Sequence, residues 1–358
     1  MNNYDAIVIG AGHNGLCNAA YLAKSGLKVL VLEKNDYIGG AAVSRELEEG
    51  WLYSNCSYVC SLLRPEIYRD LNLQKHGLQV IAYGGSVTFT KDGDIFGGYS
   101  DHDVSRREIG RFSKKDADAY NRFSRDISKQ CRFIKPLLMR TPPDPTSFKP
   151  KDLNELIWLF KRLYGLGEET IYETIRFYTM SVAEYLEEYF ENDVVKAALS
   201  GSGIIGTGLG PYSPGTAYVL LHHYMGEVDG SIGSWGFARG GMGSVSNALA
   251  GALQEHHGEI KTNAEVKQIL VKNGRSVGVV LENGDELYAK NIVSNLDVKR
   301  TYLKLFEHGD LDEKIIDQVE NFKIRGSSGK LNIALDGLPE FPAMGKNNPL
   351  MHADMHFI

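Results

Sequence analysis

The stretch YDAIVIGAGHNG, residues 4–15, decides the fold of this 358-residue chain. A short apolar run suited to a buried parallel strand leads directly into the pattern G-x-G-x-x-G. Gly10 allows a sharp turn out of the strand, Gly12 lets a pyrophosphate approach the backbone, and Gly15 lets the next helix pack closely. Phosphates are expected at the helix N-terminus, where unpaired N–H groups and the helix dipole favour anions.

The residues that follow supply the rest of a dinucleotide-binding βαβ unit. Residues 16–23 predict a helix, Gly26 is expected to end it as a left-handed cap, and residues 27–32 predict a second strand. Glu33 stands about 20 residues past the glycines, where a carboxylate can accept hydrogen bonds from ribose hydroxyls. Because that carboxylate would repel a ribose 2′-phosphate, the stretch argues against NADP. A βαβ unit without a nucleotide is the alternative interpretation.

Composition limits the class of protein. At 358 residues the chain exceeds one typical core, so two domains are expected. Charged residues make up 23% and the formal net charge is -6, which predicts no general attraction for nucleic acid. The basic residues between Arg122 and Arg140 are a local exception. They are interpreted first as a solvated helix face and second as a contact for an anionic membrane surface.

Several observations bear on the compartment. The first predicted strand begins at residue 4, which leaves no room for a signal or transit peptide, and no apolar run reaches transmembrane length. The four cysteines do not form a disulfide framework, and Cys56 and Cys60 lack a second pair of ligands for zinc. We therefore expect a cytoplasmic protein without a metal site, or a mitochondrial-matrix protein if the source is eukaryotic.

The middle of the chain predicts a hairpin followed by helices. Asp92-Gly93 is a turn signal between two short strands, and the pattern becomes helical from about residue 114 to residue 198. Residues 152–166 place their apolar side chains on one side, which predicts a core-facing helix. A face that contacts a membrane or an apolar substrate is the alternative.

Three later segments also bear on the fold. Residues 201–206 repeat G-x-G-x-x-G, but a helical pattern precedes them and a Gly/Pro-rich segment follows, so we predict no second nucleotide site there. Residues 240–243 form a glycine loop before a helix that Ser244 can cap, and this loop could expose N–H groups to a cofactor. From Val266 onward, two Asn-Gly turns predict an antiparallel meander.

These segments resemble the flavin-dependent oxidoreductases of the phytoene desaturase and amine oxidase superfamily. The likeness covers nearly the whole chain and is carried by residues 38–43, 62–65, 221–226, 235–243 and 293–295. It implies FAD, with the second glycine pair, Gly39-Gly40, on the flavin side of the pyrophosphate. The residues that we expect at the cofactor are Gly10, Gly12, His13, Asn14, Gly15, Glu33, Lys34, Gly39, Gly40, Ala41, Gly241, Met242, Gly243, Val266 and Ser294.

The resemblance also implies the architecture. We expect an α/β fold with a Rossmann-like FAD-binding domain of the glutathione reductase type, discontinuous over residues 1–60 and 235–300. An α+β substrate domain would comprise residues 61–234 and 301–358. Relatives continue beyond this length and close the flavin pocket with a further glycine-rich segment, so we expect the sequence to be a fragment.

The predicted function is that of an FAD-dependent oxidoreductase, dehydrogenase-like or desaturase-like, which transfers hydride between flavin and an apolar small molecule. Ala41 stands where carotenoid desaturases often carry Arg, which argues against a carotenoid substrate. The sequence identifies no catalytic side chain, and His222, Tyr224 and Trp235 are candidates for the pocket only. The alternatives are a non-catalytic carrier of a prenylated or lipid partner and an NAD-dependent dehydrogenase. Peripheral membrane contact is a further possibility, and the oligomeric state is left open.

Overall fold

The computed structural model describes residues 4–326, 328–337, 339–345, 348 and 355–357. The chain divides into two compact units. The first comprises the chain up to Ile81, residues 236–324 and residues 329–335, and the second comprises residues 82–235, 325–328 and 336–358. Both units are therefore discontinuous in sequence.

A six-stranded sheet organises the first unit, in the order β11-β2-β1-β14-β13-β12. Its strands are β1 (Tyr4–Ile9), β2 (Val29–Leu32), β11 (Glu259–Lys261), β12 (Val266–Lys272), β13 (Arg275–Leu281) and β14 (Glu286–Ser294). β1 pairs in parallel with both β2 and β14, and β11 pairs in parallel with β2. The chain then turns back on itself, because β13 is antiparallel to both β12 and β14.

The predicted βαβ unit and meander are confirmed. The helix α1 spans His13–Lys24, and Gly26 follows it with a φ of 90°. At the turn between β12 and β13, Asn273 and Gly274 both have positive φ, at 52° and 71°. A two-residue type I′ turn needs this conformation at both positions, which explains why the Asn-Gly pair predicts the turn.

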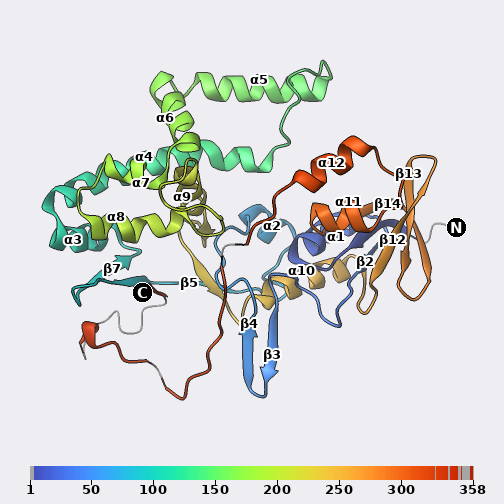
Figure 1. The fold of residues 1–358 in the computed structure, drawn as a ribbon, viewed down its shortest axis with the longest axis horizontal. Helices are drawn as coiled ribbons and strands as arrows, with labels where there is room; N and C mark the ends of the chain where they lie inside the picture. Colours follow the sequence, from blue (N-terminus) through green and yellow to red (C-terminus); the bar gives the residue numbers. More distant parts are fainter. Residues whose placement is uncertain (1–3, 327, 338, 346–347, 349–354, 358) are drawn as a thin grey trace. The chain divides into compact units, whose positions relative to one another are not determined.

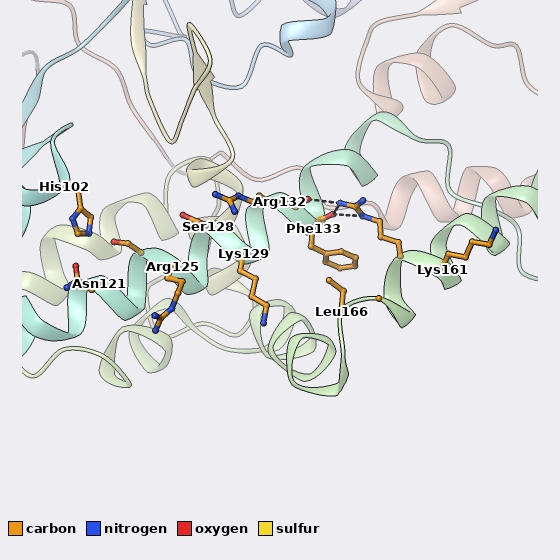
Figure 2. Close-up of a pocket in the computed structure, with 12 residues that line it drawn as sticks. His102, Asn121, Arg125, Ser128, Lys129, Arg132, Phe133, Lys161 and Leu166 are labelled. Carbon is orange, nitrogen blue, oxygen red and sulfur yellow. Dashed lines mark hydrogen bonds between the residues drawn. The ribbon is translucent and has the colours of Figure 1, made fainter.

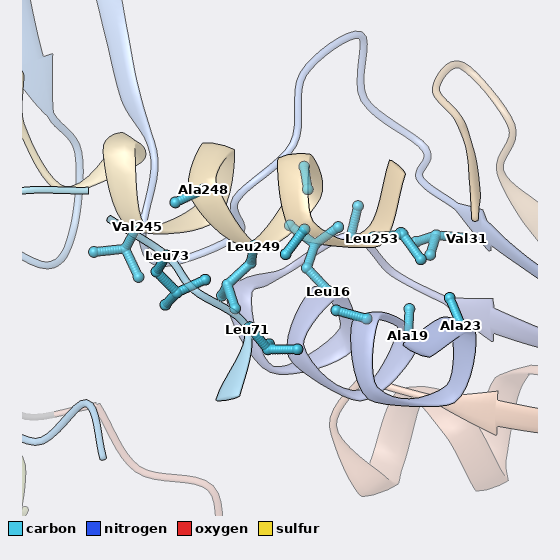
Figure 3. Packing of buried hydrophobic residues seen from close by; sticks show 14 of the residues in the cluster. Leu16, Ala19, Ala23, Val31, Leu71, Leu73, Val245, Ala248, Leu249 and Leu253 are labelled. Carbon is cyan, nitrogen blue, oxygen red and sulfur yellow. The ribbon is translucent and has the colours of Figure 1, made fainter. Parts of the chain in front are cut away.

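Two helices cover one face of the sheet. α1 packs beside α10 (Gly243–Glu255), and Figure 3 shows Leu16 and Ala19 of α1 close to Leu249 and Leu253 of α10. These side chains share one buried cluster with Ala6 and Val8 of β1. The intervening residues Ile7 and Ile9 belong to a second cluster on the opposite face. Because residues 6–9 of β1 are buried on both faces, this part of its sequence is continuously apolar.

Shorter elements complete the first unit. They are β3 (Ser44–Glu48), β4 (Trp51–Ser54), α2 (Pro65–Asp70), β5 (Val80–Ala82, whose last residue belongs to the second unit), β10 (Gly236–Ala238), α11 (Val298–Lys304) and α12 (Glu313–Asn321). The unit differs from the expected FAD-binding domain by residues 329–335 and by two longer segments, residues 61–81 and 301–324. Leu73 and Leu78 are buried against α1 and α10, and Leu305 is buried against the opposite face of the sheet. Burial of these distant apolar side chains moves both segments into the first unit.

The second unit is mainly helical. Its helices are α3 (His102–Phe112), α4 (Lys114–Ile134), α5 (Pro150–Tyr164), α6 (Glu168–Thr179), α7 (Val182–Glu187), α8 (Asp193–Ser200) and α9 (Thr216–Tyr224), with 3₁₀ turns at Lys135–Met139, Gly201–Gly203 and Pro342–Met344. Its strands are β6 (Gly85–Phe89), β7 (Ile95–Tyr99), β8 (Glu227–Val228), β9 (Ser231–Ile232) and β15 (Met355–Phe357). Aromatic rings fill the helical core, where Phe177 and Tyr185 lie with centroids 4.4 Å apart.

The predicted hairpin and the helical segment expected before the second G-x-G-x-x-G are confirmed in this unit. β6 and β7 form the predicted antiparallel hairpin, and Gly93 in its turn has a φ of 78°. The second G-x-G-x-x-G follows α8 and begins as a 3₁₀ turn. Since no strand leads into it, the context that a dinucleotide site needs is missing there.

The predicted core-facing helix is wrong in its orientation. The helix forms as α5 (Figure 1). It contains no fully buried residue. The side chains of Ile157, Phe160 and Tyr164 are 52%, 67% and 81% exposed. Only its last turn reaches the core, through Leu163. Periodicity identifies an apolar face but cannot say which part of the protein covers it.

None of the helices in the described part of the chain has the length and apolarity to cross a membrane.

Candidate dinucleotide site

The glycine turn lies at the carboxyl end of the central strand β1. The N–H of Gly10 donates to the carbonyl oxygen of Leu32 at 2.7 Å, and Gly10 has a φ of 94°, so the residue turns the chain in a conformation that favours glycine. Gly12 is the N-cap of α1, and no side chain caps this helix start. The first N–H groups of α1 are therefore available to an anion.

Two of the glycines allow close packing that a Cβ would prevent. A Cβ on Gly15 would lie 2.3 Å from the carbonyl oxygen of Gly10, and one on Gly12 would lie 2.8 Å from Nδ2 of Asn295. Asn295 directly follows β14, whose last residue Ser294 pairs with Ile9. Asn295 is not among the predicted site residues, because the pairing of β1 with β14, rather than a local motif, places it at the glycine turn.

The second glycine pair lies against the first motif. The N–H of Gly39 donates to the carbonyl oxygen of Ala11 at 2.8 Å. A Cβ on Gly40 would lie 3.0 Å from the Cα of Gly12, and Gly40 has a φ of 58°. The structure thus brings together two segments that the sequence separates, as expected if both approach one pyrophosphate. Ala41 follows on the exposed surface.

Glu33 is 7% exposed and is already hydrogen-bonded. One carboxylate oxygen accepts from the N–H of Ala11 at 2.9 Å. The other accepts from the backbone N–H and the side-chain amide of Asn35, at 3.0 and 2.8 Å. A carboxylate has about four acceptor positions, so these three bonds leave one for a ribose hydroxyl. Lys34 is exposed. Asn35 was not predicted, and its position two residues after Glu33 is the only signal for it.

The two polar residues inside the glycine motif differ in environment. Asn14 is exposed, whereas His13 is partly buried and its Nδ1 has no hydrogen-bond partner among the described residues. Burial lowers the pKa of His13, while the backbone of Gly39 opposes that shift. A neutral imidazole beside the glycine turn can donate a hydrogen bond to a phosphate or accept one from a hydroxyl.

The third glycine loop is anchored by two serines. The N–H of Met242 donates to Oγ of Ser54 at 3.0 Å, and the N–H of Gly243 donates to Oγ of Ser44 at 2.9 Å. These N–H groups are therefore engaged with β3 and β4, in contrast to the expected exposure. The predicted cap at Ser244 is wrong, since the N-cap is Met242 and Ser244 instead donates to the carbonyl oxygen of Gly241.

The two residues expected near the nucleotide lie on two strands of the sheet, β12 and β14, that β13 separates. Val266 begins β12, and two residues earlier the N–H of Ala264 donates to the carbonyl oxygen of Glu33 at 2.8 Å. Ser294 ends β14, and its hydroxyl lies 2.7 Å from that of Thr301. Ser294 also borders a cavity of about 390 Å³. Val266 thus follows two residues after a backbone contact with Glu33, whereas the hydroxyl of Ser294 is engaged within the protein.

The pocket candidates of the second unit are partly buried. Nδ1 of His222 is buried without a partner among the described residues, and the ring of His223 stacks on Trp235 with centroids 5.4 Å apart. Burial, together with His223, lowers the pKa of His222. Burial strongly raises the pKa of Tyr224. These environments favour neutral side chains, and a catalytic role for any of them stays a prediction. The described residues contain no cluster of His, Cys, Asp and Glu suited to a metal ion.

Comparison with known families gives two matches. Residues 8–72 match the NAD(P)-binding Rossmann-like domain, and residues 99–343 match the flavin containing amine oxidoreductase family. The two regions together include the glycine turn, Glu33, the second glycine pair and the helices α3 to α9 of the second unit.

Individual proteins agree with these families. The chain is 35% identical over 360 residues to pyridine nucleotide-disulfide oxidoreductase domain-containing protein 2 of Rattus norvegicus, covering 95% of this chain and 61% of the relative. It is 30% identical to the chloroplastic prolycopene isomerase of Daucus carota, covering 89% of this chain and 50% of that protein. The chain therefore spans only part of these relatives.

A solved structure agrees in fold. A putrescine oxidase triple mutant with redesigned cofactor binding superimposes with a TM-score of 0.56 at 17% identity, covering 88% of this chain and 63% of that one. At this identity the likeness concerns the fold alone.

Proposed function

Since the chain belongs to the flavin containing amine oxidoreductase family, we propose that it is an FAD-dependent oxidoreductase, whether it acts by itself or within a longer protein. The observation that carries the proposal is the meeting of Gly12 with the Gly39-Gly40 pair beside Glu33. One motif alone suits any dinucleotide. A second glycine pair at the same turn supports a cofactor that continues past the pyrophosphate along a second segment of the chain, as FAD would.

We assign the cofactor to the first unit. Gly10, Gly12 and Gly15 would hold the pyrophosphate, Glu33 would accept a ribose hydroxyl, and the Gly39-Gly40 pair would pass beside the phosphates towards the flavin. The antiparallel meander of β12 and β13, which extends the sheet beyond β14, supports the glutathione reductase type of this domain. The helical second unit would provide the substrate domain.

The chemistry proposed is hydride transfer between the substrate and flavin. The bound flavin would supply the redox chemistry. The protein would bind and orient the substrate and the flavin, and it would exclude water. We propose that the substrate is an apolar small molecule. The name of the carrot relative, a prolycopene isomerase, supports this class of substrate. His222, Tyr224 and Trp235 remain the candidates for its pocket.

The test is the cofactor of the purified chain. We expect flavin absorption in the visible spectrum and, after denaturation, release of a molecule with the mass of FAD. Release of NAD would instead identify a nicotinamide-dependent dehydrogenase. A folded chain that neither retains nor takes up any flavin would contradict the proposal and favour the carrier of a prenylated or lipid partner.

A further inference from the structure

A basic groove lies between α4 and α5 in the second unit. It has a volume of about 890 Å³, and Figure 2 shows Lys129 and Arg132 on α4 and Lys161 on α5 among the residues that line it. Its positively charged residues are Arg125, Lys129, Arg132, Lys161 and Arg162. The other seven lining residues include no Asp or Glu.

The charges of this groove are poorly compensated within the protein. In the part of the chain that the structure describes, Lys129, Arg132 and Lys161 form no ion pair, and Arg125 lies 3.9 Å from Asp126. Other cations of the same unit are paired: Arg140, for example, contacts both oxygens of Glu155 at 2.7 and 2.8 Å. The groove therefore presents a local positive potential despite the negative net charge of the chain.

Arg162 holds the two walls of the groove together. Its guanidinium donates to the carbonyl oxygens of Arg132 and Phe133 at 2.7 and 3.1 Å, at the C-terminal turn of α4. These carbonyls carry the negative end of the α4 dipole, which suits a cation. The bonds fix the last turn of α5 against α4 and keep Lys161 at the mouth of the groove.

The neighbouring face of α5 is apolar and uncovered. Leu153, Ile157, Phe160 and Tyr164 follow one another at spacings of four, three and four residues, so they form one stripe. Their exposed fractions are 40%, 52%, 67% and 81%. Lys161 follows Phe160 directly, so a cation stands beside this stripe. Tyr172 and Ile175 of α6 are also exposed, at 62% and 58%.

We propose that the basic groove and the α5 stripe together dock on the surface of an anionic phospholipid bilayer. Lys and Arg attract anionic headgroups, while Phe, Tyr, Leu and Ile enter the boundary between headgroups and acyl chains. Charge complementarity favours a bilayer over a second copy of the chain. An apolar stripe alone could pack against a second copy, but the five cations of the groove would repel the same five cations of that copy. The inference goes beyond the oxidoreductase activity and does not require bound flavin.

The experiment is co-sedimentation of the full 358-residue chain with vesicles. We expect binding to phosphatidylcholine vesicles that contain phosphatidylglycerol, weakening as salt is raised, and little binding to phosphatidylcholine alone. Each juxtamembrane cation contributes roughly fivefold in affinity, so Lys129→Glu/Lys161→Glu is expected to weaken binding by at least about 25-fold. Phe160→Ser/Tyr164→Ser is also expected to weaken binding, without changing its salt dependence.

Matched controls separate the surface from general charge and hydrophobicity. Lys267→Glu/Lys323→Glu makes the same charge change at exposed residues of the first unit, and Leu47→Ser/Leu52→Ser removes exposed apolar side chains there. Both controls are expected to bind like the unaltered chain. Thermal unfolding of each variant verifies the fold, which these exposed substitutions are expected to preserve.

Three results would overturn the proposal. They are equal binding to neutral and anionic vesicles, unchanged binding of Lys129→Glu/Lys161→Glu, and a dimer in light scattering that Phe160→Ser/Tyr164→Ser disrupts while no variant binds vesicles. The last result would assign the stripe to a second copy of the chain. A chain that lacks flavin but binds anionic vesicles would leave the inference intact and contradict only the oxidoreductase assignment.

Discussion

The carboxylate of Glu33 accepts a hydrogen bond of 2.9 Å from the backbone N–H of Ala11, so the end of β2 is tied directly to the glycine turn after β1. The residue that would bind ribose therefore also shapes the loop that would bind phosphate. The role of Glu33 in the fold can be separated from its role toward the cofactor.

Glu33→Ala is expected to lower the free energy of unfolding by about 1.5–3 kcal/mol, because it leaves the N–H groups of Ala11 and Asn35 without a buried charged acceptor. Urea unfolding of the flavin-free chain measures this effect. Glu33→Gln keeps one acceptor oxygen, so its free energy of unfolding is expected to fall less than that of Glu33→Ala. Equal stability of Glu33→Ala and the unaltered chain would contradict the structural role.

Gly15→Ala tests the close packing of α1 on the glycine turn. The new Cβ would meet the carbonyl oxygen of Gly10 at 2.3 Å, and backbone cannot rotate away as a side chain could. We expect a loss of about 1–3 kcal/mol in unfolding free energy and a lower flavin content. The control is Gly201→Ala, whose Cβ would meet nothing within 4 Å. A flavin content that Gly15→Ala leaves unchanged would show that this packing is dispensable.

Ser44→Ala removes the acceptor of the Gly243 N–H at the start of α10. This hydroxyl acts as an N-terminal cap supplied from β3, so its removal is expected to destabilise the chain by about 0.5–2 kcal/mol. Chemical denaturation measures the change. Ser128→Ala, at an exposed serine of α4, is expected to be neutral, and a similar effect of both substitutions would argue against the cap.

The stability of the chain is expected to fall as the pH drops below about 6.5, partly through His222. Its pKa is lowered in the folded state, so below the unfolded value of about 6.5 the unfolded chain binds more protons than the folded one. Protons then favour unfolding. His222→Gln is expected to reduce the loss of melting temperature between pH 7 and pH 5. His308→Gln, at an exposed histidine, is the control, and an identical pH dependence of all three proteins would refute the contribution of His222.

The local parts of the site could be predicted from sequence because each depends on a few neighbouring residues. A glycine with positive φ, an Asn-Gly turn and a carboxylate at a strand end act within their own segment. Asn295, Ser44 and Ser54 could not be predicted in this way. They meet the glycine loops only through tertiary packing, and Ser44 lies 199 residues from its partner Gly243. The prediction that α5 faces the core was wrong for a related reason. An apolar face in the sequence does not specify which part of the protein packs against it.

The pairing of Tyr4 with Ala289 has a consequence for synthesis. β1 (Tyr4–Ile9) emerges from the ribosome long before one of its two neighbours, β14 (Glu286–Ser294). At roughly 5–20 residues per second, the open edge of β1 waits about 15–60 seconds for its partner. During that time an apolar strand with unpaired backbone groups is exposed to other nascent chains. Expression yield should therefore respond to chaperone supply and growth temperature more strongly than the stability of the finished protein would suggest.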